Sequence, residues 1–186
     1  MATETRRTKL TYEDVVKFPD DGLRHEIIDG EHSVTAAPFT RHQRIVANLH
    51  LALAHHVKDN GAGEVFIAPL DIVFTDTDVV EPDLIFVSKE RSHVVTERHL
   101  RGDPDLVIEV LSEATRKRDE TIKRKLYERC DVSEYWTVDP DLETVRVFRR
   151  EGGAYGRPVE LSRERGDAIE TPLLSGLVIA LAVIFP

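Results

Sequence analysis

The chain has 186 residues, a formal net charge of −9 and a single cysteine, Cys130. This length allows one domain, 1–186, to bury a stable core, and one cysteine excludes an internal disulfide framework. The acidic balance argues against a protein that coats nucleic acid with its whole surface, but it is compatible with a local basic patch.

The first third of the chain predicts a short helix, a hairpin and a long helix. After a polar start without the apolar run of a signal peptide, TYEDVVKFP (11–19) is typical of a short helix. Residues 20–36 predict a hairpin with its turn at Asp29-Gly30. Thr40 is the expected N-cap of a helix whose apolar positions recur at helical spacing until Asn60-Gly61.

The remaining chain predicts strands around a second helix. Strands are expected at EVFIAPLDIVFT (64–75), VVEPDLIFVS (79–88), PDLVIEVLS (104–112), SEYWTVDP (133–140) and TVRVFRR (144–150), and a helix at TRKRDETIKRKLYERC (115–130). GLVIALAVIFP (176–186) is too short to span a bilayer and is expected in the core. The pattern indicates an α/β or α+β fold, and the single cysteine favours a cytoplasmic protein.

The carboxylate of Glu109 lies in the middle of an otherwise apolar strand. A buried carboxylate needs a cation, a hydrogen-bond donor or a metal nearby. Asp105 shares its strand face but lies about 13 Å away, whereas Asp83, on the preceding strand, would lie about 5 Å away if the two strands are antiparallel neighbours. Two such carboxylates form an all-oxygen site that suits Mg²⁺ or Mn²⁺, which points towards phosphate chemistry.

A nuclease-like metal site would also be expected to carry a lysine two residues after Glu109, but Leu111 occupies that position. At about 100° per residue, Lys123 of the second helix lies on the sheet-facing arc with Asp119, Leu126, Tyr127 and Cys130. We therefore expect Lys123 to face Glu109. The segment 116–129 has seven basic and three acidic residues, which favours a phosphate-facing edge.

Six segments are informative together through their order and spacing: RHEIIDGE, TRHQRIVANL, EPDLIFVS, PDLVIEVLSEAT, RDETIKRKLYERCDVSEYWTVDP and the apolar tail. In this order and spacing they resemble the Uma-two family of restriction endonuclease-like proteins, a branch of the PD-(D/E)XK nuclease superfamily. The resemblance spans almost the full chain. It departs from the family at Glu113, where members often carry proline, and at DVSEYW, which replaces a commoner Gly-Val-Pro form.

The resemblance implies a restriction-endonuclease-like core, in which a central mixed β-sheet is flanked by helices. It also implies a metal site at Asp83 and Glu109, completed by the backbone carbonyl of Val110, a lysine displaced onto the helix at Lys123, and Glu26 as a further acidic site residue. The implied activity is hydrolysis of phosphodiester bonds in DNA by an endonuclease that uses Mg²⁺, or Mn²⁺ in its place. A homodimer would supply two sites for cutting two strands.

Two other functions stay open at this stage. The first is a module of the same fold that binds nucleic acid or a protein without cutting. The second is a glycoside hydrolase, which the 6% aromatic content disfavours because sugar clefts are lined with aromatic rings. Zinc is not expected, since no HExxH or Cys/His ligand spacing is present.

The proposed site residues also have structural interpretations. Glu109 could pair with a buried arginine or lysine, Asp83 could cap a turn, and Lys123 could form an ion pair only with Asp119 at i, i+4. Glu26 could lie on a solvated face of the hairpin. His42 is more typical of a satisfied first-turn histidine, Tyr127 of a core residue, and the basic run of a solvated helix face.

Overall fold

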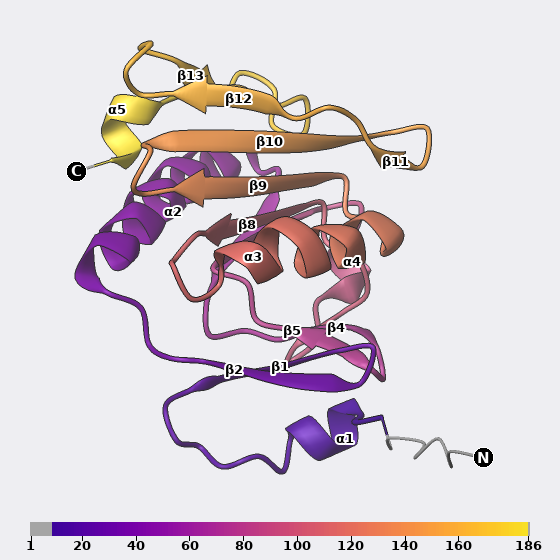
Figure 1. Ribbon diagram of the computed structural model, residues 1–186. Helices are drawn as coiled ribbons and strands as arrows, with labels where there is room; N and C mark the ends of the chain where they lie inside the picture. The colour runs from indigo at the N-terminus through magenta and orange to yellow at the C-terminus, as the bar shows by residue number, and fades with distance from the viewer. Residues whose placement is uncertain (1–8, 186) are drawn as a thin grey trace.

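The computed structural model describes residues 9–185, so the predictions for the polar first eight residues lie outside it. The larger of the two main sheets is mixed and has seven strands (Figure 1). Six of them lie in the order β11-β10-β9-β8-β6-β3, and β12 pairs with β10. Strands β8 and β9 are parallel and the other pairs are antiparallel. The strands are β3 (Gly63–Ile67), β6 (Leu84–Ser88), β8 (Leu106–Val110), β9 (Glu134–Asp139), β10 (Thr144–Glu151), β11 (Ala154–Tyr155) and β12 (Val159–Ser162).

Helices cover both faces of this sheet (Figure 1). One face packs against α2 (Thr40–Asn60), and the other packs against a helical segment made of α3 (Arg116–Arg118), the π-helical turn η2 (Asp119–Lys123) and α4 (Arg124–Arg129). Side chains of a strand alternate between the faces. Ile108 therefore faces α2, whereas Val107 faces α4, and Glu109 shares the α4 side with Val107. The predicted mixed sheet flanked by helices is confirmed.

A second sheet, in the order β2-β1-β5-β4-β7, lies beside the first (Figure 1). Its strands are β1 (Arg24–Ile28), β2 (Glu31–Thr35), β4 (Ile72–Thr75), β5 (Asp78–Val80) and β7 (Leu100–Arg101). The predicted hairpin is β1-β2, with Asp29 and Gly30 both at positive φ in its turn. The remaining elements are α1 (Tyr12–Val15), η1 (Ser92–Val94), β13 (Ala168–Ile169), β14 (Ile179–Ala180) and α5 (Leu181–Ile184).

Two predicted strands are each divided between the two sheets. The segment 64–75 forms β3 in the large sheet and β4 in the small one, and 79–88 forms β5 in the small sheet and β6 in the large one. The breaks fall at Pro69 and Pro82, where the chain has no amide to donate to a neighbouring strand. Each segment therefore crosses between the sheets, and this crossing brings the start of β6 next to β1.

The two ends of α2 differ in how well the sequence predicted them. Gly61 adopts the left-handed conformation with φ 56° and ends the helix, as predicted. The prediction of Thr40 as N-cap is wrong by one residue, because Phe39 holds the extended cap conformation, and its side chain has no group to accept a hydrogen bond from the first turn.

The apolar C-terminal segment packs in the core, as predicted. Leu177, Ile179, Leu181, Ile184 and Phe185 are buried in the same cluster as the apolar side of α2. Within residues 9–185, no helix is both long enough and apolar enough to cross a membrane.

Candidate active site

The pairing of β6 with β8 brings Asp83 and Glu109 together. The strands are antiparallel with Leu84 opposite Ile108, so continuing the register by one residue sets Asp83 opposite Glu109. The Val110 amide donates to Asp83 Oδ2 at 2.8 Å. Asp105 lies at the other end of β8, where its Oδ2 accepts from the Ser88 amide at 2.6 Å, and it takes no part in this cluster.

The helix opposite this sheet face contributes Lys123, which is 3% exposed. Its Nζ donates to Glu109 Oε1 at 2.8 Å and lies 2.7 Å from Glu26 Oε1, whereas Asp119 Oδ1 is more distant at 3.7 Å. Lys123 is the last residue of the π-helical turn, a feature that often occurs at functional sites because it redirects side chains. The i, i+4 contact with Asp119 is thus the weakest of its three ion pairs.

Glu26 reaches the same lysine from the second sheet. It lies on β1, is 1% exposed, and its Oε1 also accepts from the Glu81 amide at 2.9 Å. The interpretation of Glu26 as a residue of a solvated face is therefore wrong. Tyr127 of α4 donates its hydroxyl to Glu109 Oε1 at 2.8 Å, so this core residue also contacts the site.

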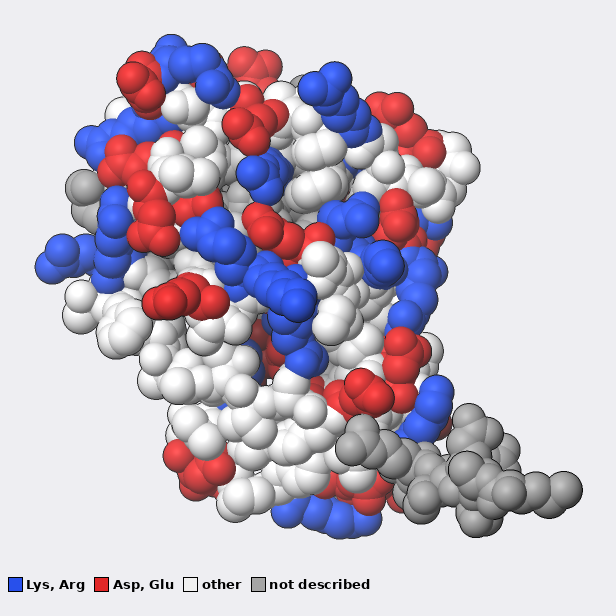
Figure 2. Space-filling view, in the orientation of Figure 1, with Lys and Arg blue, Asp and Glu red and all other residues white. Residues whose placement is uncertain are grey.

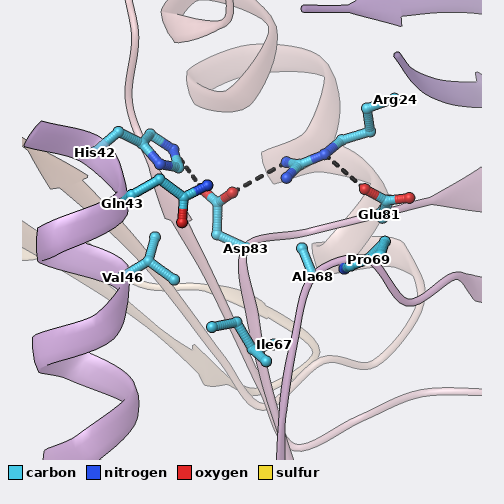
Figure 3. A pocket seen from close by; sticks show the side chains of 9 residues that line it. All are labelled: Arg24, His42, Gln43, Val46, Ile67, Ala68, Pro69, Glu81 and Asp83. Carbon is cyan, nitrogen blue, oxygen red and sulfur yellow. Dashed lines mark hydrogen bonds and ion pairs between the residues drawn. The ribbon is translucent and has the colours of Figure 1, made fainter. Parts of the chain in front are cut away.

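Asp83 is held by two side chains that the sequence predictions did not include in the site. Arg24 Nη1 lies 3.0 Å from Asp83 Oδ1, and His42 Nε2, from the first turn of α2, lies 3.1 Å from Oδ2. Arg24 Nε also pairs with Glu81 Oε1 at 2.8 Å. Figure 3 shows this chain of contacts along the wall of a pocket of about 150 Å³.

The sequence contained a signal for two site residues that were not predicted, Arg24 and Asp119. Arg24 and Glu26 are two positions apart on β1 and therefore share a strand face. Asp119 lies on the same helical arc as Lys123, and its side chain is buried next to it. For His42, the position in the first turn of a helix does not indicate which carboxylate it meets.

A cleft of about 760 Å³ contains the four predicted site residues, Glu26, Asp83, Glu109 and Lys123. Its walls also include residues 35–39, the segment 110–115 that follows β8, and Pro140-Asp141. Two sheets and two helical segments therefore converge on one opening.

Burial controls the charge of this cluster. It raises the pKa of Glu109 to about 8, with Lys123 opposing the shift and the neighbouring carboxylates adding to it, and it raises the pKa of Asp119 to about 6. Burial alone would lower the pKa of Lys123, but the surrounding carboxylates outweigh it and raise the pKa. For Asp83, His42 and Arg24 overcome the effect of burial and lower the pKa. Lys123 and Asp83 are therefore charged at neutral pH.

The donor chemistry of the cluster fits a hard divalent cation. Within residues 9–185 no three His, Cys, Asp or Glu side chains already have the arrangement of a metal site, and both oxygens of Asp83 are bonded to protein donors. However, both donors to Glu109 use Oε1, which leaves Oε2 for another ligand, and Asp119 Oδ1 is buried without a hydrogen-bond partner. Carboxylate oxygens are the ligands that Mg²⁺ prefers, and Asp83 would exchange a protein donor for the ion.

The basic run of the second helix is largely used within the fold. Figure 2 shows Lys and Arg side chains gathered over the α3–α4 segment, with acidic side chains among them. Arg116 pairs with Asp139, and Arg129 pairs with Asp78. Of the seven basic residues in 116–129, only Arg118 and Lys123 line the cleft. The run therefore brings two basic side chains to the cleft, and a phosphate-facing edge stays a prediction.

Comparisons with known proteins agree with this fold. The Uma2 family, described as "Putative restriction endonuclease", matches residues 12–182. The sequence matches no curated protein. The crystal structure of a "putative nuclease belonging to DUF820" from Anabaena variabilis is similar with a TM-score of 0.79, covering 95% of this chain and 97% of that chain at 21% sequence identity. At this identity the similarity establishes the fold.

Proposed function

Because the chain belongs to the Uma2 family of restriction endonuclease-like proteins, we propose that it hydrolyses phosphodiester bonds in DNA with the help of a divalent metal ion. One observation carries this proposal: Lys123 joins Glu26 and Glu109 next to Asp83 within a single cleft. A buried lysine with two buried carboxylates is costly to maintain, and the cost is understandable where the cluster performs chemistry.

The roles of the residues follow from their contacts. Asp83 and Glu109 would hold Mg²⁺, or Mn²⁺ in its place, and the ion would supply Lewis-acid stabilisation of charge on the phosphate. The charged Nζ of Lys123 would stabilise the negative charge that develops on the phosphate or position the attacking water. Glu26 orients Lys123 through the 2.7 Å contact, and Tyr127 orients Glu109 by bonding to Oε1.

The charge balance supports a metal requirement. Four carboxylates of the cleft, Glu26, Asp83, Glu109 and Asp119, are buried, but Lys123 is the only lysine or arginine of the described chain that is buried with them. Arg24 and Arg118 are partly exposed at 19% and 21% of their side chains. When these carboxylates are ionised, a divalent cation would offset their negative charge, and their excess over buried basic side chains is the physical argument for the ion.

One observation favours a second candidate function. Arg24 and His42 already bond both oxygens of Asp83, so this carboxylate has partners without an ion. This arrangement suits a module that binds nucleic acid or a protein on the same fold without cutting it. Metal binding distinguishes the two functions, because a module that binds without cutting does not need a metal ion.

The test is a cleavage assay on supercoiled plasmid and single-stranded DNA in Mg²⁺, Mn²⁺ and EDTA. We expect cleavage that requires metal and falls by about 100-fold or more in Glu109→Gln and Lys123→Met, measured at a temperature at which circular dichroism shows both variants folded. Two matched controls should stay close to wild type. Glu134→Gln changes another buried strand carboxylate, which bonds Arg149 and Trp136 outside the cleft, and Lys125→Met changes an exposed lysine on the same helix.

Two results would contradict the nuclease proposal. If wild type cleaves no substrate and calorimetry detects no Mn²⁺ binding, the binding module becomes the better description. If cleavage survives in Glu109→Gln, the site lies elsewhere. Sedimentation of the protein with and without DNA tests separately the homodimer that the sequence resemblance implies.

A further inference from the structure

Arg118 has an unused hydrogen-bonding edge in the cleft. Its Nε and Nη2 are buried and have no hydrogen-bond partner among the described residues. The carboxylate paired with it is Glu26, whose Oε2 lies 3.7 Å from Nε, beyond hydrogen-bonding distance. Nε and Nη2 form the side of a guanidinium group that binds two oxygens of one carboxylate or phosphate at once. Buried donors without a partner are unfavourable, so this edge calls for a ligand.

The other basic side chains of the cleft differ from Arg118 in this respect. Arg24 hydrogen bonds Asp83 and pairs with Glu81, and Lys123 hydrogen bonds Glu109. Arg41 donates from Nη2 to Glu143 Oε1 at 3.2 Å. Among the lysines and arginines that line the cleft within residues 9–185, Arg118 is thus the one whose guanidinium lacks a hydrogen bond.

Glu26 is poorly placed to become the missing partner. Its Oε1 is already held by Lys123 and by the Glu81 amide, and these contacts fix the carboxylate from the other side. The backbone of Arg118 directly precedes the π-helical turn, in which Asp119 and Lys123 are buried. The open edge therefore remains available to a ligand that enters the cleft.

We infer that the Nε–Nη2 edge of Arg118 binds one phosphate group of the nucleic-acid backbone, an inference that rests on the proposed function for the identity of the ligand. A phosphodiester presents two unesterified oxygens, which match the two donors of this edge. The bound phosphate would lie in the same cleft as Glu109 and Lys123, so Arg118 would position the strand for the reaction.

Two measurements test this inference. In the first, inorganic phosphate is titrated into the protein while the Nε–H resonance of Arg118 is followed by NMR, assigned by its disappearance in Arg118→Lys. In the second, fluorescence anisotropy measures the affinity for a labelled DNA oligonucleotide in EDTA at several salt concentrations. The variants are Arg118→Gln, Arg118→Lys and the control Lys117→Gln, which removes the same charge from an exposed neighbour outside the cleft.

We expect phosphate to shift the Arg118 resonance, and Arg118→Gln to weaken DNA binding by about 10-fold or more. The slope of log affinity against log salt should fall by about 0.7 to 0.9. Arg118→Lys should keep the salt slope but remain several-fold weaker, because lysine retains the charge and loses the paired donors. Lys117→Gln should change the affinity by less than about 2-fold.

The outcomes separate this inference from the proposed function. If wild type binds DNA and folded Arg118→Gln binds it equally well, the phosphate site is refuted while the nuclease proposal stands. If phosphate shifts the Arg118 resonance but DNA does not bind, the anion site stands and the proposed function fails. If Arg118→Lys restores full affinity, the paired-donor geometry is refuted and only the charge matters. Circular dichroism of each variant shows whether it is folded.

Discussion

Replacing Lys123 with methionine should destabilise the protein strongly. Lys123 is 3% exposed, and its Nζ lies 2.7 and 2.8 Å from two carboxylates that are themselves buried. Methionine has a similar length but no charge, so Lys123→Met leaves these carboxylates without their buried cation. Breaking a buried ion pair by removing one partner costs about 3 to 5 kcal/mol. That is a large fraction of the roughly 5 to 15 kcal/mol by which a domain of this kind is stable.

Urea denaturation followed by circular dichroism measures this effect. With a slope of about 2 kcal/mol per molar urea, a loss of about 4 kcal/mol lowers the midpoint by about 2 M. The exposed control Lys125→Met should change the stability by less than about 0.5 kcal/mol. At alkaline pH, where Glu109 loses its proton, adding Glu109→Gln to Lys123→Met should recover part of the loss, because it removes a buried charge that has no cation.

The loss should also depend on pH. The pKa of Glu109 is raised to about 8 in the folded protein, and removing Lys123 raises it further. A raised pKa stabilises the fold at low pH and loses that contribution as the pH rises through the folded value, whereas Lys123 of wild type stays charged throughout. The deficit of Lys123→Met should therefore be smaller at about pH 5 than at about pH 9. A loss below about 1 kcal/mol, or a deficit that grows towards low pH, would refute this reasoning.

Three further predictions test other parts of the structure. Tyr127→Phe removes the hydroxyl that donates to Glu109 Oε1 at 2.8 Å and keeps the ring. Calorimetry should show that the free energy of unfolding falls by about 1 to 2 kcal/mol. An unchanged melting temperature would mean that this hydrogen bond is not formed. Gly63→Ala places a Cβ 2.1 Å from the Val87 carbonyl oxygen at φ +150°, so it should cost well over about 2 kcal/mol. Gly152→Ala, at φ +60° in open space, should cost only about 1 kcal/mol, and equal losses would contradict the close approach of β3 to β6. Asp139 accepts from the Asp141 and Leu142 amides and pairs with Arg116, and these contacts lower its pKa against the effect of burial. The Asp139 carboxylate therefore stabilises the fold above about pH 3.9, and this contribution is lost as the pH falls below that value. Asp139→Asn should be less stable than wild type by roughly 1 to 2 kcal/mol at pH 7, and the two stabilities should converge in acid. A difference that stays constant with pH would show that the carboxylate charge is irrelevant.

Much of the fold was predictable because it depends on local chemistry. The Asp29-Gly30 turn needs residues that tolerate positive φ, and Gly61 ends α2 for the same reason. The position of Lys123 on the sheet-facing arc follows from helical periodicity, and the structure buries it with Asp119, Leu126 and Tyr127. The pairing of Asp83 with the strand of Glu109 could be anticipated from strand alternation and antiparallel neighbours.

Only the tertiary structure brought Arg24 and His42 to Asp83. They are 59 and 41 residues away in sequence, and neither contact has a local signature. Both depend on the crossing of the chain between two sheets at Pro82, because this crossing sets the start of β6 against β1 and the first turn of α2. The protonation states of the cluster could not be predicted from the sequence either, since the pKa of a carboxylate depends on its burial and its neighbours. Short-range periodicity decides which way a side chain points, whereas the side chain it meets depends on how distant segments pack.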